Sequence, residues 1–169
     1  MTAPERRILF VCLGNICRSP MAEGIARHLA EQADCAQPLQ FDSAGTGRWH
    51  LGDPPDPRAI ATAARKGVDI AALRGRQVAA QDFARFDLIL ALDRSNLAAL
   101  RAKAPAGAKA RLALFLEETL GRAEDVPDPY FGAEDGFETV YTMLFEGCSA
   151  LIEKLGPGGS CSEKTSSVR

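Results

Sequence analysis

Residues 6–24, RRILFVCLGNICRSPMAEG, run from a mostly apolar segment through a short glycine-bearing loop into a helical pattern. An apolar run over residues 6–11 is typical of a strand buried on both faces, as in a parallel sheet. Ser19 and Pro20 suit the start of a helix, with serine as the cap and proline in the first turn. Apolar residues then recur at helical spacing at Met21, Ile25 and Leu29. We therefore expect a strand, a loop and a helix in succession.

The alternation of strand and helix continues along the chain. Further strands are predicted at residues 39–45, 86–93 and 110–116, and further helices at residues 56–67, 94–104 and 134–155. This order predicts an α/β fold in a single domain over residues 1–155, with a parallel sheet that carries helices on both faces. The remaining residues, 156–169, are rich in glycine and serine, and we expect a flexible C-terminal tail there.

Length and composition exclude several classes of protein. A chain of 169 residues, 46% hydrophobic and 25% charged, fits one soluble globular domain. A net charge of -2 gives no electrostatic reason to expect binding to nucleic acid or to an anionic membrane. The apolar run over residues 8–13 is too short for a signal peptide, and no segment is long enough for a transmembrane helix. We expect a cytoplasmic monomer.

The cysteines and histidines argue against disulfide staples and against a metal site. The cysteines number five, an odd count in a chain that is large enough to fold without cross-links. They stand at positions 12, 17, 35, 148 and 161 and contain no Cys-x-x-Cys pair. His28 and His50 have no spacing that suits metal ligands. We therefore expect free thiols and neither metal nor other cofactor.

The loop that follows the first strand is suited to binding an anion. A loop that leads into a helix presents backbone N–H groups without intrahelical partners, and the helix dipole adds partial positive charge there. Gly14 permits a sharp turn, and Asn15 tolerates left-handed backbone angles better than most residues do. Arg18 can hold two oxygens of a phosphate in one planar fork. The predicted anion-binding segment is Leu13, Gly14, Asn15, Ile16, Cys17, Arg18 and Ser19.

Cys12 stands at the start of this loop, where a thiol becomes a nucleophile. A helix N-terminus and a nearby arginine both favour the thiolate form of a cysteine. A thiolate beneath an oxyanion cradle predicts attack on phosphorus, with a cysteinyl-phosphate that water later hydrolyses. On its own, a cysteine at the end of a buried strand is most often a small core residue, and only the surrounding loop favours the catalytic interpretation.

The leaving group of such a reaction needs a proton, and the segment VPDPYFG at residues 126–132 can supply one. Asp128 lies between two prolines in a stiff loop, and we expect it to act as the general acid. Tyr130 and Phe131 follow it and could form a wall against a flat aryl substrate. Alone, Asp128 would be read as a turn residue before proline.

With these motifs the chain resembles the low-molecular-weight protein tyrosine phosphatase family. The resemblance rests on CLGNICRSP at residues 12–20 and DPYFG at residues 128–132, and it extends over residues 6 to about 154. It implies a four-stranded parallel sheet in the order 2-1-3-4, with a phosphate-binding loop after the first strand and a metal-free mechanism. The substrate would be a phosphotyrosine protein or a small aryl phosphate.

The same resemblance implies a role for each matching residue. Cys12 would be the nucleophile, Arg18 the phosphate-binding residue and Asp128 the proton donor. The residues that brace the loop would be Asn15, Ser19 and Ser43, and those that line the substrate cleft would be Ile16, Trp49, Tyr130 and Phe131. Cys17 would be able to form a reversible disulfide with Cys12 under peroxide.

At two positions the sequence departs from the family pattern. Phe131 stands where many members have a second tyrosine, and Leu73 stands where many have a histidine of the bracing network. Three other residues allow a simpler interpretation. Cys17 fits a packing role and a redox-protective role equally well, and His50 is interpreted as a surface residue. Asp93 is interpreted as a helix cap in preference to a residue that braces the loop.

Three other functions remain to be separated from tyrosine phosphatase activity. An arsenate reductase of the same fold needs relay thiols near residues 80–95, and that segment contains none. A protein arginine phosphatase is a related alternative, but related arginine phosphatases carry threonine where this chain has Ile16, and the apolar Ile16 favours tyrosine. A sensor that binds a phosphorylated partner without turnover would have no reason to keep both Cys12 and Asp128.

Overall fold

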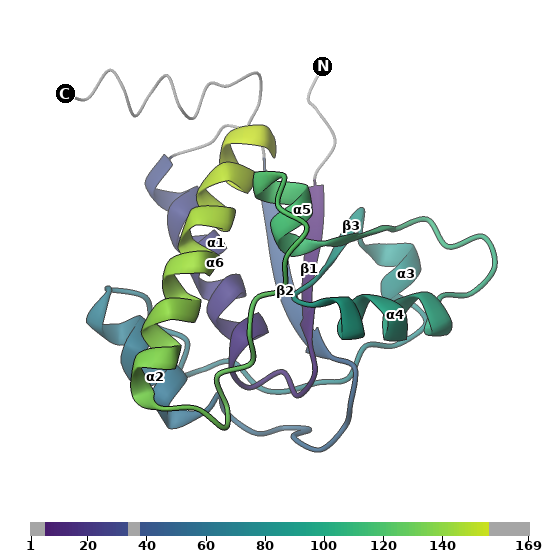
Figure 1. Ribbon diagram of the computed structural model, residues 1–169. Coiled ribbons are helices and arrows are strands. Elements are labelled where there is room, and N and C mark those ends of the chain that lie inside the picture. Colours follow the sequence, from purple (N-terminus) through teal and green to yellow (C-terminus); the bar gives the residue numbers. More distant parts are fainter. Residues whose placement is uncertain (1–5, 34–37, 156–169) are drawn as a thin grey trace.

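Four parallel strands form the centre of the protein, and the first strand of the chain lies inside the sheet (Figure 1). The computed structural model describes residues 6–33 and 38–155. The strands are β1 (Arg6–Cys12), β2 (Leu39–Gly45), β3 (Leu88–Ala91) and β4 (Arg111–Leu114), in the order β2-β1-β3-β4. The predicted parallel sheet and its strand order are confirmed.

Helices cover both faces of this sheet, as predicted (Figure 1). On one face lie α1 (Arg18–Ala33), α2 (Pro57–Arg65), α5 (Phe115–Leu120) and α6 (Glu134–Leu155). On the other face lie α3 (Asp82–Arg85) and α4 (Arg94–Lys103). Since the strands are parallel, their carboxyl ends share one edge of the sheet, where the loop between β1 and α1 is found.

The side chains of β1 alternate between two apolar cores. Ile8 and Phe10 face the core under α1 and α6, whereas Leu9 and Val11 face the core under α3 and α4. All four are almost completely buried. The ring of Phe10 lies 6.1 Å from the rings of both Phe41 and Phe115, so it packs in the middle of the larger core. This burial on both faces explains why the strand has a nearly continuous apolar sequence.

The main error of the sequence prediction concerns residues 110–116. The strand ends at Leu114, and the last two residues of the predicted strand begin α5 instead. Phe115 is fully buried, and a short apolar run does not distinguish a buried strand from a buried helix. The short α3 was also missed, and β3 is shorter than the predicted strand over residues 86–93.

Some sequence predictions fall outside the described residues. The predicted flexible tail at 156–169 lies there, as do Cys35 and Cys161. The other three cysteines, Cys12, Cys17 and Cys148, are free thiols. Within residues 6–33 and 38–155, no helix has the length and apolar character needed to cross a membrane.

Gly24 allows α1 to pack closely against the segment after α2, and this contact gives a stability prediction. A Cβ atom at position 24 would lie 2.4 Å from Ile70 Cγ2 and 3.1 Å from Val68 Cγ1. We expect Gly24→Ala to lower the free energy of unfolding by about 1–3 kcal/mol, because overpacking outweighs the better helix propensity of alanine. Denaturant unfolding followed by circular dichroism measures this change.

Gly136 in the first turn of α6 provides the matched control. A Cβ there would have its nearest neighbour, Pro129 Cβ, at 3.8 Å, an ordinary contact distance. Gly136→Ala should therefore leave the stability unchanged or raise it by up to about 1 kcal/mol. Equal stability of the Gly24→Ala and Gly136→Ala variants would contradict the packing argument.

Candidate active site

The loop at residues 12–18, which we call the anion loop, carries β1 into α1 around a left-handed turn. Asn15 has a φ angle of 59°, in the region that asparagine tolerates better than most residues. Within the described part of the chain, no acceptor engages the backbone N–H groups of residues 13–17. These amides lie at the N-terminal end of α1, so the loop is a concave set of donors suited to an anion.

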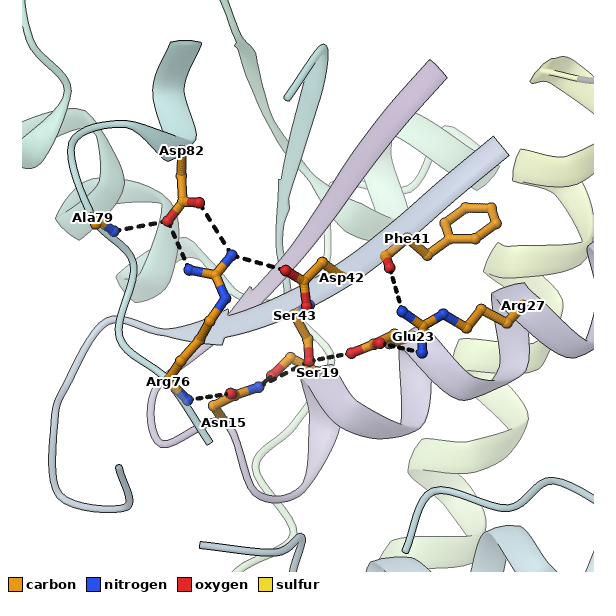
Figure 2. A network of polar contacts seen from close by, with 10 residues as sticks. All are labelled: Asn15, Ser19, Glu23, Arg27, Phe41, Asp42, Ser43, Arg76, Ala79 and Asp82. Carbon is orange, nitrogen blue, oxygen red and sulfur yellow. Dashed lines mark hydrogen bonds and ion pairs between the residues drawn. The ribbon is translucent and has the colours of Figure 1, made fainter. Parts of the chain in front are cut away.

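The Asn15 side chain holds this turn with three hydrogen bonds (Figure 2). Its Nδ2 donates to Ser19 Oγ at 2.8 Å and to Ser43 Oγ at 3.1 Å. Its Oδ1 accepts the backbone N–H of Arg76 at 2.9 Å, which fixes the orientation of the amide. Asn15 thus contacts both of the other predicted bracing residues, Ser19 and Ser43.

Three acidic residues and two arginines extend this network beneath the loop (Figure 2). Ser43 Oγ donates to Glu23 Oε1 at 2.7 Å, and Arg27 pairs with Glu23 Oε2 at 2.7 Å. Burial raises the pKa of Glu23, although the Ser43 hydrogen bond and Arg27 oppose this shift. On the other side, Arg76 is held by Asp42 and Asp82. Sequence reasoning did not find these partners.

Ser19 does not cap the helix, because α1 already begins at Arg18. Its hydroxyl instead lies 3.0 Å from Cys12 Sγ. Since Ser19 Oγ already accepts a hydrogen bond from Asn15, its own hydrogen is available to the sulfur. Cys12 is buried at the end of β1, within hydrogen-bond distance of this hydroxyl and close to the N-terminal end of α1.

Arg18 is buried and held by three oxygen atoms from distant segments. Its Nη1 donates to Asp93 Oδ2 at 2.6 Å and to the Val126 carbonyl oxygen at 3.0 Å, while Nη2 lies 3.6 Å from Asp128 Oδ2. Burial opposes the charge of this guanidinium, but the negative charges at Cys12, Asp93 and Asp128 outweigh it and raise the pKa of Arg18. Arg18 is therefore a fixed cation beside the thiol.

Asp93 combines the two roles that the sequence analysis treated as alternatives. Its Oδ1 accepts the backbone N–H of Asn96 at 2.7 Å and caps α4, as predicted. Its Oδ2 accepts from Arg18, so the preference for a cap alone was incomplete. The second role depends on a contact between residues 75 positions apart, which no local pattern indicates.

A pocket of about 230 Å³ opens above the anion loop. The predicted nucleophile, anion-binding arginine and acid, Cys12, Arg18 and Asp128, all line it. The other lining residues are Leu13, Gly14, Ile16, Cys17, Trp49, His50, Tyr130 and Phe131. The predicted cleft residues are therefore brought together, while Asn15 and Ser19 lie behind the loop as braces.

The prediction that His50 is a surface residue was incomplete, because this partly exposed side chain also lines the pocket. The imidazole is half-buried and lines the pocket, with its Nδ1 lying 3.2 Å from Asp53 Oδ2. A Cβ at Gly14 would lie 3.2 Å from His50 Cδ2, so the ring lies directly over the loop. The available signal was its position next to Trp49, in a loop already predicted to reach the cleft.

The segment at residues 126–132, which we call the acid loop, presents Asp128 to the pocket. The carboxyl is partly exposed, and its Oδ1 accepts the backbone N–H of Tyr130 at 3.0 Å. Tyr130 and Phe131 make an edge-to-face pair with ring centroids 4.9 Å apart. Phe131 and Trp49 are 93% and 69% exposed, so a bound aryl group could bury apolar surface on both.

Cys17 is a buried thiol on the same loop. Burial is the main cause that raises the pKa of Cys17, and the carboxylate of Asp56 adds to the shift. It therefore remains a protonated thiol at neutral pH.

Across the described residues, no three His, Cys, Asp or Glu side chains are grouped as metal ligands.

The chain is similar to known proteins over most of its length. The family model for low molecular weight phosphotyrosine protein phosphatase matches residues 7–159. A low molecular weight protein-tyrosine-phosphatase from Streptomyces coelicolor is 44% identical over 152 residues, which are 86% of this chain and 91% of the relative.

Solved structures of this fold are also similar. The crystal structure of YfkJ from Bacillus subtilis matches with a TM-score of 0.82 and 38% identity, covering 90% of this chain and 96% of YfkJ. An arginine phosphatase from Drosophila matches with a TM-score of 0.81 and 34% identity, covering 89% and 98%.

The double role of Asp93 can be separated by mutation. Serine keeps one oxygen to cap α4 but is too short to reach Arg18, so Asp93→Ser should weaken the binding of inorganic phosphate about 10-fold. The free energy of unfolding should change by less than about 1 kcal/mol. Isothermal titration calorimetry and denaturant unfolding measure these two effects.

Asp125 offers a matched control at the same end of α4. Its Oδ1 accepts the backbone N–H of Arg94 at 3.0 Å, and no contact to Arg18 is among its interactions in the described residues. Asp125→Ser should bind phosphate as the wild type does. Wild-type phosphate affinity in the Asp93→Ser variant would show that Asp93 does not orient Arg18.

Proposed function

The chain belongs to the low-molecular-weight phosphotyrosine protein phosphatase family, and from this we propose that it hydrolyses phosphotyrosine through a cysteinyl-phosphate intermediate. In this proposal Cys12 is the nucleophile, Arg18 binds the phosphoryl group and Asp128 is the proton donor. The observation that carries it is the shared pocket of these three side chains above a loop of unpaired amides.

In the first step, the Cys12 sulfur attacks phosphorus, and an S–P bond forms as the bond to the tyrosyl oxygen breaks. The amides of residues 13–17 and the Arg18 guanidinium take up the charge of the three non-bridging oxygens. Asp128 transfers its proton to the departing phenolate oxygen. Arg18 Nη2 and Asp128 Oδ2 lie 3.6 Å apart, and this distance supports a role for Asp128 as the acid next to the proposed phosphate site.

In the second step, water attacks the phosphocysteine and the S–P bond breaks. The Asp128 carboxylate accepts a proton from this water, and inorganic phosphate leaves. The negative charge returns to Cys12 Sγ, where the Ser19 hydroxyl at 3.0 Å stabilises it as a leaving group. Cys17 lies in the same loop, and we assign it the role of disulfide partner when Cys12 is oxidised.

The apolar walls of the pocket favour an aryl phosphate over a small aliphatic one. Ile16 and the aromatic residues Trp49, Tyr130 and Phe131 are among the residues that line the pocket. A phenyl ring among them would bury apolar surface on both sides. We further propose that the phosphatase domain spans residues 1–155, is a cytoplasmic monomer and acts on phosphotyrosine proteins without binding nucleic acid.

Phosphoarginine is the second substrate to be tested, because a solved relative is an arginine phosphatase. The guanidinium of phosphoarginine is polar, whereas Ile16 and the surrounding rings are apolar. Desolvating this group without a hydrogen-bond partner is unfavourable, so the pocket favours phosphotyrosine. Comparison of kcat/KM for the two phospho-amino acids in peptides of one sequence distinguishes them.

Replacement of the nucleophile should abolish turnover. We expect Cys12→Ser to lose more than about 10³-fold in kcat on p-nitrophenyl phosphate, since serine lacks a base to activate it. Rapid acid quenching of the wild type should trap phosphate on Cys12, and mass spectrometry identifies the peptide. Assays in EDTA also test the metal-free mechanism.

Cys148 supplies the control for this experiment. It is not among the residues that line the pocket, and its buried thiol donates to the Ala22 carbonyl oxygen at 3.6 Å. Cys148→Ser should keep its activity and its trapped phosphocysteine. An active Cys12→Ser variant, or phosphate trapped elsewhere, would reject the proposal.

The role of Asp128 predicts a dependence on the leaving group. Asp128→Asn should lower kcat/KM about 10²-fold or more for phenyl phosphate, whose leaving group needs a proton, and much less for dinitrophenyl phosphate. A series of aryl phosphates measures the slope against leaving-group acidity. Asp125→Asn is the control from the neighbouring segment, and equal slowing of all substrates by Asp128→Asn would reject its role as acid.

A further inference from the structure

Arg58 in the first turn of α2 connects the acid loop to the anion loop. We propose that Arg58 is a positioning residue, which fixes the acid loop so that Asp128 faces the bond to be broken. The inference builds on the proposed function and adds to it a residue that does not touch the phosphate site. Arg58 is not among the residues that line the pocket.

The first half of this connection runs from Arg58 to the anion loop through Asp56. Arg58 Nε and Nη2 donate to the two Asp56 carboxylate oxygens at 3.0 and 2.8 Å, a two-pronged ion pair. The backbone N–H of Asp56 donates in turn to the Ile16 carbonyl oxygen at 2.8 Å. The hydrogen bond from Arg58 is the main cause that lowers the pKa of Asp56, so this carboxylate stays ionised.

The second half runs from Arg58 to the acid loop. Nη2 also donates to the Tyr130 carbonyl oxygen at 3.1 Å, and the guanidinium lies 5.5 Å from the Tyr130 ring centroid. The backbone N–H of Tyr130 donates to Asp128 Oδ1 at 3.0 Å. Tyr130 is therefore held on its carbonyl side by Arg58 and on its amide side by the carboxyl of the proposed acid.

Packing fixes the guanidinium between these partners. Its central carbon lies 4.7 Å from the ring centroid of Phe137, a fully buried residue of α6. The flat guanidinium can stack on a ring and donate in its own plane at the same time, which an ammonium group cannot do. The site therefore requires arginine for its geometry as well as for its charge.

Arg58 anchors the acid loop at one end through its hydrogen bond to the Tyr130 carbonyl oxygen. At the other end, the Val126 amide donates to the Leu92 carbonyl oxygen at 2.9 Å, and its carbonyl accepts from Arg18. Asp128 lies midway between Val126 and Tyr130, with its carboxyl partly exposed. Release of the Tyr130 anchor would leave the nucleophile and Arg18 in place and would allow the acid alone to move.

The test is the leaving-group dependence of an Arg58→Met variant, in which the aliphatic stem is kept and the hydrogen bonds are lost. We expect kcat/KM for phenyl phosphate to fall about 10-fold, because a small displacement of the general acid strongly lowers the rate of proton transfer to the leaving group. For dinitrophenyl phosphate it should change less than about 2-fold. Arg58→Lys keeps the charge without the planar fork and should show the same selective loss.

Arg65 on the same helix is the matched control. Its guanidinium is exposed and pairs with Glu138 at 2.7 Å, away from the acid loop. Arg65→Met should therefore leave both substrates unaffected. Equal slowing of phenyl and dinitrophenyl phosphate by Arg58→Met would overturn the proposal, because a merely structural loss reduces all turnover alike.

A double mutant separates this inference from the proposed function. With Asp128 already replaced by asparagine, Arg58→Met should cause no further change in the leaving-group slope, and a further change would overturn the positioning role. Phosphocysteine should still be trapped on Cys12 in Arg58→Met at the wild-type level with dinitrophenyl phosphate. Absence of phosphocysteine in the wild type itself would instead reject the proposed function.

Discussion

The left-handed turn at Asn15 is the constraint on which the site depends. A φ angle of 59° brings the amides of residues 13–17 to the inner side of the anion loop, and the Asn15 side chain stabilises that turn from behind. Its three hydrogen bonds reach α1, β2 and the segment that contains Arg76. The loop is therefore shaped before any anion binds, and the cost of ordering it is met during folding.

The same hydrogen bonds also give the network a direction. Arg76 donates to the Asn15 oxygen, so the Asn15 nitrogen donates to both serines, and each serine keeps its own hydrogen available to donate onward. Ser43 donates to Glu23, a carboxylate beneath the loop, and Ser19 is left to donate to Cys12. The Glu23 carboxyl group and the Cys12 sulfur thus lie at the two ends of one hydrogen-bonded chain.

The parts of the site that sequence reasoning recovered are the parts that local patterns encode. The strand, the loop from Cys12 to Arg18 and the Asp128 segment each have a characteristic composition within a few residues. Sequence reasoning missed the roles of Glu23 and Arg76 and the contact of Asp93 with Arg18. These contacts join residues that are 20 to 75 positions apart in the chain. His50 was missed although it adjoins Trp49, and α5 was missed because a buried apolar run has no readable period.

The two proposed reacting groups are held by different means, and the difference follows from their chemistry. Cys12 must keep one position through both proposed steps. Its side chain is 2% exposed at the end of a central strand, and the surrounding core restricts its movement. Asp128 must give a proton in one step and accept one in the next, so it must meet first a phenolate and then a water molecule. A partly exposed carboxyl on a loop, anchored on both sides by Val126 and Tyr130, can meet both partners without moving the phosphate site.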